Sequence, residues 1–230
     1  MEKANGTVQK LTDEVRTAVH TMFSDKYRDP VRYHEFAKKY GRETLAMQIA
    51  ELCTKYIPID PANASRPRLL DLAAGTGIIS TELAKQGYDV IAADINPSML
   101  ELLRQLHPDI HAVETDFNNP FPFDTGQFDG ITTFGGNRYI TKEGLPIFMS
   151  EVYRTLKENG AFVWSMLPIE GPFWKLRSGI DQPTSTYTLS RLLRENGFKD
   201  TYIDRSQFFH NLTHTPTTVI RTPFYLIARK

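Results

Sequence analysis

Short apolar runs alternate with amphipathic stretches along most of the chain from residue 67 onward. The pattern predicts strands at 69–74, 88–94, 110–116, 128–134, 160–167, 198–209 and 219–229, with helices between them at 77–85, 97–106, 145–158 and 186–196. Strands separated by helices indicate a parallel sheet with right-handed crossovers. About nine residues separate the last two strands, too few for a helical crossover, so we expect them to form an antiparallel hairpin.

The first 66 residues lack strand character. Asp29-Pro30 has the pattern of an N-cap residue followed by proline at the first helical position. Residues 42–56 place apolar side chains near one helical face, and a proline-containing connector follows. We therefore expect an N-terminal helical cap with its linker over residues 1–66, followed by one main domain over residues 67–230.

The amino-acid composition limits which binding partners and which cellular compartment are expected. The 230 residues include 27 basic and 27 acidic side chains, so the balance of charge points neither to nucleic acid nor to an anionic membrane. A lone Cys53 cannot form an internal disulfide and suggests a reducing compartment. The N-terminus has no apolar signal region, and no apolar run approaches the roughly 20 residues of a membrane helix. The expected location is the cytoplasm.

The strongest local signal is the sequence DLAAGTG (71–77) at the first strand-to-helix turn. Gly75 and Gly77 let the backbone turn tightly and approach a ligand closely. The helix that follows points its free amides at whatever lies there. Because glycine-rich turns are common, this segment alone does not identify a ligand.

Acidic residues also end the next two predicted strands. A carboxylate at Asp94 can accept hydrogen bonds from both hydroxyls of a ribose, and Ile95 and Met99 can supply apolar walls for an adenine. Asp116 can accept from an adenine amino group, with Phe117 against the ring. Three carboxylates thus end the first three strands, on the edge where open parallel sheets bind ligands.

A dinucleotide-binding enzyme is the natural rival, because GTGIIS (75–80) nearly matches the phosphate-binding fingerprint and Asp94 suits the ribose of NAD. Asp71 argues against this, since a carboxylate repels a pyrophosphate but attracts the ammonium and sulfonium of S-adenosylmethionine. Ser80 also replaces the small residue that the fingerprint needs, and the Tyr-x-x-x-Lys of short-chain oxidoreductases is missing.

With these residues in view, the chain resembles the class I S-adenosylmethionine-dependent methyltransferases. LLDLAAGTG and IAADINPSML resemble their first two motifs, and Asp116-Phe117, FDGITTF and VYRTLKENGAFVWSM resemble later ones. Ala73 departs from the glycine of many members. The resemblance is closest to the small-molecule, ubiquinone-type branch. It implies an α/β fold: a Rossmann-like, seven-stranded, mostly parallel sheet with a terminal antiparallel hairpin, helices on both faces and the N-terminal helical cap. It assigns cofactor binding to Asp71, Ala73, Gly75, Thr76, Gly77, Asp94, Ile95, Met99, Asp116, Phe117 and Phe134.

The family resemblance also limits which substrates and which catalytic groups are expected. After the fourth strand the sequence is FGGNRY (134–139), without the Asn/Asp-Pro-Pro-aromatic motif of enzymes that methylate base amines or protein glutamine. The carboxylates of catechol-type metal enzymes are missing after the fourth and fifth strands, so no catalytic metal is expected. His210 and His214 have a spacing that pairs metal ligands on a helix, but they fall in the predicted hairpin without an evident third ligand.

Aromatic residues are frequent late in the chain, at or beyond the predicted strand ends and in insertions, where an acceptor could bind. About half of them are expected to belong to the core. Residues 168–185 form an insertion longer than a connection needs, as lids often are. These features favour a flat or lipophilic small molecule as acceptor. The aromatic residues concerned are Phe134, Tyr139, Trp164, Phe173, Trp174, Tyr187, Phe208 and Phe209.

Three residues are candidates for taking a proton from the acceptor or for orienting it. His210 and His214 lie just past the sixth strand, where histidine suits proton transfer near neutral pH, and Tyr139 is a candidate to orient the acceptor. The principal hypothesis is methyl transfer from S-adenosylmethionine to oxygen, nitrogen or carbon of a small acceptor. An NAD(P)-dependent oxidoreductase and a non-catalytic methyltransferase-like binding protein remain alternatives, and a homodimer stays open.

Overall fold

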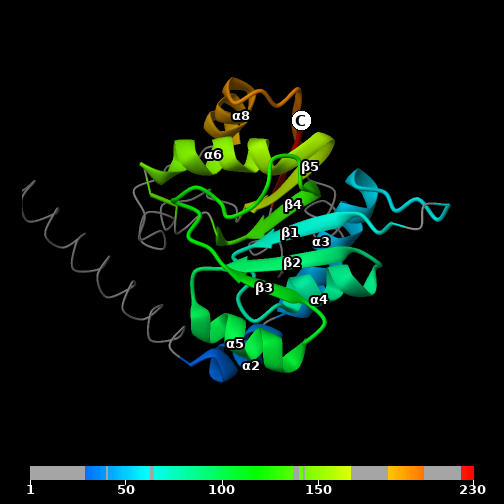
Figure 1. The fold of residues 1–230 in the computed structure, drawn as a ribbon, viewed down its shortest axis with the longest axis vertical. Coiled ribbons are helices and arrows are strands. Elements are labelled where there is room, and N and C mark those ends of the chain that lie inside the picture. Colours follow the sequence, from blue (N-terminus) through cyan, green and yellow to red (C-terminus); the bar gives the residue numbers. More distant parts are fainter. Residues whose placement is uncertain are drawn as a thin grey trace, which may run out of the picture.

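The computed structural model describes residues 29–39, 41–62, 65–136, 140–141, 143–166, 186–204 and 224–230. Helices cover both faces of one central sheet, so the described chain forms three layers (Figure 1). None of the helices in these ranges is both long and apolar enough to cross a membrane.

The sheet has seven strands in the order β3-β2-β1-β4-β5-β7-β6. Their bounds are β1 Arg68–Leu72, β2 Asp89–Asp94, β3 His111–Glu114, β4 Phe128–Phe134, β5 Leu156–Met166, β6 Asp200–Asp204 and β7 Phe224–Arg229. Neighbours from β3 to β5 pair in parallel, whereas β7 is antiparallel to both β5 and β6. The predicted fold class, including the terminal hairpin, is confirmed.

Two helical layers enclose this sheet. The helices α3 (Arg42–Tyr56), α4 (Ile78–Lys85) and α5 (Pro97–Leu106) pack on one face, and α6 (Gly144–Thr155) and α8 (Thr186–Glu195) pack on the other. A further helix, α2 (Pro30–Lys39), contacts α3 and α5 (Figure 1). The α6 layer has an aromatic centre, where Phe148 packs against Phe117, Phe121, Phe162 and Trp164.

The N-terminal helices follow their predicted signals. The Oδ1 atom of Asp29 accepts hydrogen bonds of 3.0 Å from the amides of Val31 and Arg32, so it caps the helix that begins at Pro30. The helix α3 has the predicted bounds and buries Ile49, Leu52 and Tyr56 against the sheet and α4. It therefore shares its core with the main domain.

Strand and helix ends differ from the prediction in places. The helix expected at 145–158 ends at Thr155, because Leu156 is fully buried and pairs with Phe128 as the start of β5. The polar residues Lys157 to Asn159 thus belong to a strand, whose register shifts opposite Asp129, and Asn159 takes a φ of 65°. The third strand ends at Glu114, so Asp116 lies in the turn that follows and not within the strand.

Candidate functional site

The glycine turn joins β1 to α4 at the carboxyl edge of the sheet. Ala73, Gly75 and Gly77 all have positive φ, of 59°, 58° and 81°. Glycine adopts this conformation without cost, whereas the methyl group of Ala73 makes its own conformation unfavourable. Gly77 has a second constraint, because an added Cβ would lie 2.8 Å from Cγ of Leu103 in α5. The turn is therefore fixed by both backbone conformation and helix packing.

Asp94, at the end of β2, holds this turn in place. Its Oδ2 atom accepts a 2.8 Å hydrogen bond from the Gly75 amide, and its Oδ1 atom accepts one of 2.9 Å from the Asn96 amide. Burial raises the pKa of Asp94, and these amides oppose that rise. A carboxylate has about four lone-pair sites, so both oxygens keep capacity for ribose hydroxyls.

Asp71 lies beneath the turn, in β1, and is only 1% exposed. The Ser80 hydroxyl donates a 2.6 Å hydrogen bond to its Oδ2 atom. Burial raises the pKa of Asp71 to about 7, although the Ser80 hydrogen bond and the Arg42 charge act in the other direction. A buried carboxylate of this kind favours a neighbouring cation and disfavours a second anion.

The cap helices bring to the turn further side chains that lie outside the cofactor-binding set assigned above. Nδ1 of His34, in α2, lies 2.8 Å from Oγ1 of Thr76, and the ring of Tyr33 lies over Gly75. Arg42, the first residue of α3, places its guanidinium carbon 4.4 Å from the ring centroid of Phe134. The Tyr-His pair early in an amphipathic helix was the available sequence signal; for Arg42 there was none, since its role depends on where α3 begins.

The residues predicted to bind the adenine differ from one another in their contacts and in their exposure to solvent. The carboxylate of Asp116 accepts from the amide and side chain of Asn118 and from the side chain of Asn119, which shapes the turn after β3. Phe117 is 3% exposed and packs edge-on against Phe148, so most of its ring belongs to the core.

The two predicted apolar walls also differ in exposure. Ile95 is 51% exposed and free to contact a ligand, whereas Met99 is buried in the inner face of α5. Of the adenine-side residues, Ile95 and Asp116 therefore offer the most accessible surface.

The structure thus brings together Asp71, the 73–77 turn, Asp94 and Phe134 around the carboxyl ends of β1, β2 and β4. Tyr139, His210 and His214 lie outside the described residues, as do Phe173, Trp174, Phe208 and Phe209. Trp164 is fully buried in the core. No group of three or more histidine, cysteine or acidic residues able to hold a metal occurs within the described ranges.

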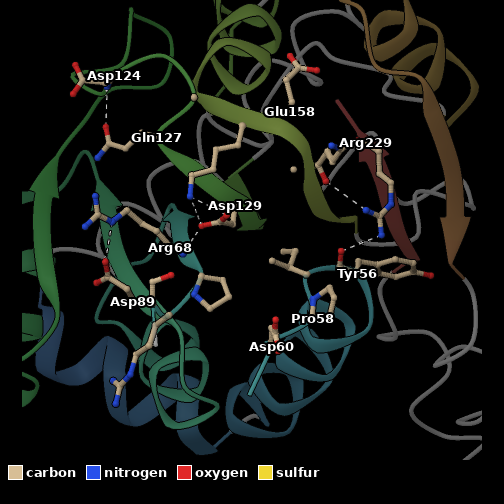
Figure 2. A pocket seen from close by; sticks show the side chains of 18 of the residues that line it. Tyr56, Pro58, Asp60, Arg68, Asp89, Asp124, Gln127, Asp129, Glu158 and Arg229 are labelled. Atoms are coloured by element: carbon tan, nitrogen blue, oxygen red, sulfur yellow. Dashed lines mark hydrogen bonds and ion pairs between the residues drawn. The ribbon is translucent and has the colours of Figure 1, made fainter. Parts of the chain in front are cut away.

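A separate cleft of about 800 Å³ lies at the opposite, amino-terminal edge of the sheet (Figure 2). Four of its charged side chains form ion pairs with one another, Arg68 with Asp89 and Lys157 with Asp129, each at 2.8 Å. Arg229 donates to the backbone oxygen of Tyr56. Parallel sheets bind ligands at their carboxyl edge, so we place the functional site at the glycine turn and not in this cleft.

Comparison with known proteins agrees with this placement. Residues 69–160 match a family described as a methyltransferase domain, a range that contains the turn, Asp94 and Asp116. This part of the chain is therefore similar to methyltransferase domains, in agreement with the resemblance drawn from the sequence.

Among individual proteins, a demethylmenaquinone methyltransferase from Clavibacter sepedonicus is 41% identical over 104 residues. That match covers 42% of this chain and 39% of the relative, so the chain corresponds to about two fifths of that enzyme's length.

Solved structures match over more of the chain. A SAM-dependent methyltransferase from Archaeoglobus fulgidus has a TM-score of 0.63 at 18% identity, covering 86% of this chain and 99% of the other. Phosphoethanolamine N-methyltransferase 2 from Haemonchus contortus, in complex with S-adenosyl-L-methionine, has a TM-score of 0.58 at 14% identity, covering 80% of this chain and 52% of the other. At such identities the likeness establishes the fold.

Proposed function

We propose that the protein transfers a methyl group from S-adenosylmethionine to a small, flat or lipophilic acceptor. The observation that carries the proposal is the position of Asp94, which ends β2 and accepts a hydrogen bond from the Gly75 amide of the glycine turn. When bound, S-adenosylmethionine supplies an electrophilic methyl group on its sulfonium.

The described residues fit this ligand from end to end. We assign Asp71 and the 73–77 turn to the methionine end, where the positive-φ glycines leave room for close approach of a ligand. We assign Asp94 to binding the ribose. Ile95 and Asp116 are assigned to the adenine, and Met99 and Phe117 pack behind them in the core.

Asp71 separates this proposal from the nicotinamide alternative. Its carboxylate is buried directly beneath the turn, where a pyrophosphate would otherwise bind. Burial raises its pKa to about 7 despite the hydrogen bond from Ser80, so it is negatively charged above that pH. An anionic ligand at the turn would meet this charge in a medium of low polarity. A ligand that carries an ammonium and a sulfonium is attracted instead.

The acceptor and the domain division belong to the same proposal. We infer a small-molecule acceptor of the kind used by the ubiquinone-type branch, because the relative from Clavibacter sepedonicus is named for a demethylated quinone. We also propose that residues 1–66 act as a cap at the cofactor edge, since Tyr33 and His34 reach the turn from α2. Alignment of the acceptor and exclusion of water by this cap would supply much of the rate enhancement.

Calorimetry with S-adenosylhomocysteine, NAD and NADP tests the proposal. The chain should bind the first and neither dinucleotide. Asp94→Ala should weaken S-adenosylhomocysteine by about 1 to 3 kcal/mol, the scale of a charge-assisted hydrogen bond. Asp89→Ala, at the other end of β2, is the matched control and should leave affinity unchanged. Unchanged affinity in Asp94→Ala would refute the ribose assignment.

A turnover assay distinguishes an enzyme from a non-catalytic binding protein. Incubation with labelled S-adenosylmethionine and a panel of quinols, phenols and amines should yield methylated product from at least one lipophilic acceptor. The reaction should persist in EDTA, because no metal is expected. Activity that vanishes with EDTA and returns with magnesium would contradict this part, and binding without any turnover would favour the non-catalytic alternative.

A further inference from the structure

The side-chain amide of Asn118 joins two segments that are separate in the sequence. Its Nδ2 group donates a 3.0 Å hydrogen bond to Oδ1 of Asp116, in the turn after β3. Its Oδ1 atom accepts a 2.7 Å hydrogen bond from the backbone amide of Thr141, in the segment between β4 and α6. A backbone N–H only donates and an ionised carboxylate only accepts, so one orientation of the amide satisfies both partners.

The far end of this bridge is the start of α6. Oγ1 of Thr141 accepts a 2.9 Å hydrogen bond from the Gly144 amide, and its carbonyl oxygen accepts one of 2.9 Å from the Leu145 amide. Gly144 is buried and leaves no room for a side chain, because an added Cβ would lie 2.8 Å from Cβ of Asn118. The Asn118 side chain therefore packs directly against the first turn of α6.

The two ends of the bridge belong to different parts of the proposed site. Asp116 is assigned to the adenine of the cofactor. Tyr139, the candidate to orient the acceptor, comes two positions before Thr141 in the sequence. Asn118 thus connects a residue of the proposed cofactor site to a segment that follows the proposed acceptor residue.

We propose that Asn118 is a positioning residue that couples occupancy of the adenine site to the order of the segment around Thr141. The inference rests on the function proposed above, and it concerns the link between the two ligands and not the binding of either one. An adenine amino group that donates to Asp116 would fix the orientation of its carboxylate. The planar amide of Asn118 would then hold its oxygen toward the Thr141 N–H. Coupling between two sites is reciprocal, so the loaded chain would also bind its acceptor more tightly.

Hydrogen exchange of residues 140–146, with and without saturating S-adenosylhomocysteine, measures this coupling, because exchange reports local opening of the backbone. In the parent chain the ligand should slow exchange there by about 5-fold or more, the low end of coupling between two sites. In Asn118→Ala the exchange rate should be the same with and without ligand. A purely structural role would raise the exchange rate of both states by the same factor and leave their ratio unchanged.

Two further variants locate the effect. Nδ2 of Asn119 donates a 2.8 Å hydrogen bond to Oδ2 of the same Asp116 carboxylate, but from an exposed position outside the bridge to Thr141. Asn119→Ala is therefore the matched control and should keep the response of the parent. Gly144→Ala disturbs the Asn118 contact from the side of α6 and should lose the response. Calorimetry should show S-adenosylhomocysteine bound no more weakly by Asn118→Ala than by Asn119→Ala, since each loses one donor to Asp116.

The other outcomes are distinguishable. If the parent binds S-adenosylhomocysteine without a change in exchange at residues 140–146, or if Asn118→Ala keeps the change, the coupling is wrong while the methyltransferase proposal stands. If Asn119→Ala loses the response as well, the turn around Asp116 acts as a whole and the assignment to Asn118 is wrong. If the parent does not bind the ligand, the proposed function fails and the inference fails with it. The parent response and Gly144→Ala keep the test decisive even if Asn118→Ala does not fold.

Discussion

Nδ1 of His34 and Oγ1 of Thr76 lie 2.8 Å apart and join the cap helix α2 to the centre of the glycine turn, across 42 positions of sequence. Thr76 is 1% exposed, so its hydroxyl has little access to water once α2 is in place. Burial of a hydroxyl without a partner is costly, which makes this contact specific for the docked helix.

His34→Ala should therefore loosen α2. We expect a loss of about 1 kcal/mol in the free energy of unfolding, the usual net value of one hydrogen bond, and faster proteolytic cleavage near residues 30–39. Urea denaturation and limited proteolysis measure the two effects. His111→Ala removes an exposed histidine from β3 and should change neither. Equal cleavage of parent and His34→Ala would show that α2 is held by its other contacts alone.

The same contact should respond to pH. Burial, assisted by the Lys38 charge, lowers the pKa of His34 below its ordinary value. The unfolded chain therefore takes up a proton before the folded chain does, and this site loses stability as the pH falls below about 6.5. The stability difference between the parent and His34→Gln should shrink on acidification. A difference independent of pH between 7.5 and 5 would contradict the assignment.

Asp71 should have the opposite pH dependence. Its pKa is raised to about 7 by burial, so the folded chain holds a proton that the unfolded chain has released between pH 4 and 7. The contribution of Asp71 to stability is thus largest at low pH and falls as the pH rises through this window.

Asp71→Asn should remove this dependence, because the amide does not ionise and its oxygen can still accept from Ser80. Its stability relative to the parent should increase from pH 4 to 7, while its affinity for S-adenosylmethionine falls at pH 8. Thermal denaturation across pH and calorimetry measure these changes, and the exposed Asp109→Asn is the control. Parallel stability curves would show that Asp71 is not protonated in the folded chain.

Gly77→Ala should destabilise the turn through both of its constraints. The residue has a φ of 81°, and the new methyl group would lie 2.8 Å from two carbons of the Leu103 side chain. We expect a loss of about 1 to 3 kcal/mol, measured by urea denaturation. Gly126→Ala isolates the backbone component, because Gly126 has a φ of 66° with nothing within 4 Å of the added Cβ. Equal losses in the two variants would mean that Leu103 moves aside freely.

The candidate proton acceptors give the last prediction. His210→Ala or His214→Ala should lower kcat by about 10²-fold, with affinity for the cofactor intact, if either histidine takes a proton from the acceptor. Steady-state kinetics with an identified acceptor measures this. If both variants turn over at the parent rate, the acceptor needs no base from this segment, and alignment is the better account.

Local patterns determined most of the elements. The Asp29-Pro30 cap, the apolar face of 42–56 and the seven apolar runs each depend on neighbours within a few residues, so the sequence alone was enough to predict them. The same holds for the glycine turn and Asp94, because a strand-to-helix turn and the end of the next strand meet at one edge of any parallel sheet.

Tertiary packing decided the remainder. Residues 156–159 have a polar, helix-compatible sequence but become strand because Leu156 pairs with Phe128. Phe117 and Met99 were expected at the ligand but are mostly buried, because Phe117 packs against Phe148 of α6 and Met99 lies on the inner face of α5. His34 and Arg42 reach the turn from helices far away in sequence. The pattern of neighbouring residues does not show which distant segments will come into contact. Long-range contacts form only when the layers pack, and therefore only the folded chain brings Arg42, Phe134 and Asp71 to one edge of the sheet.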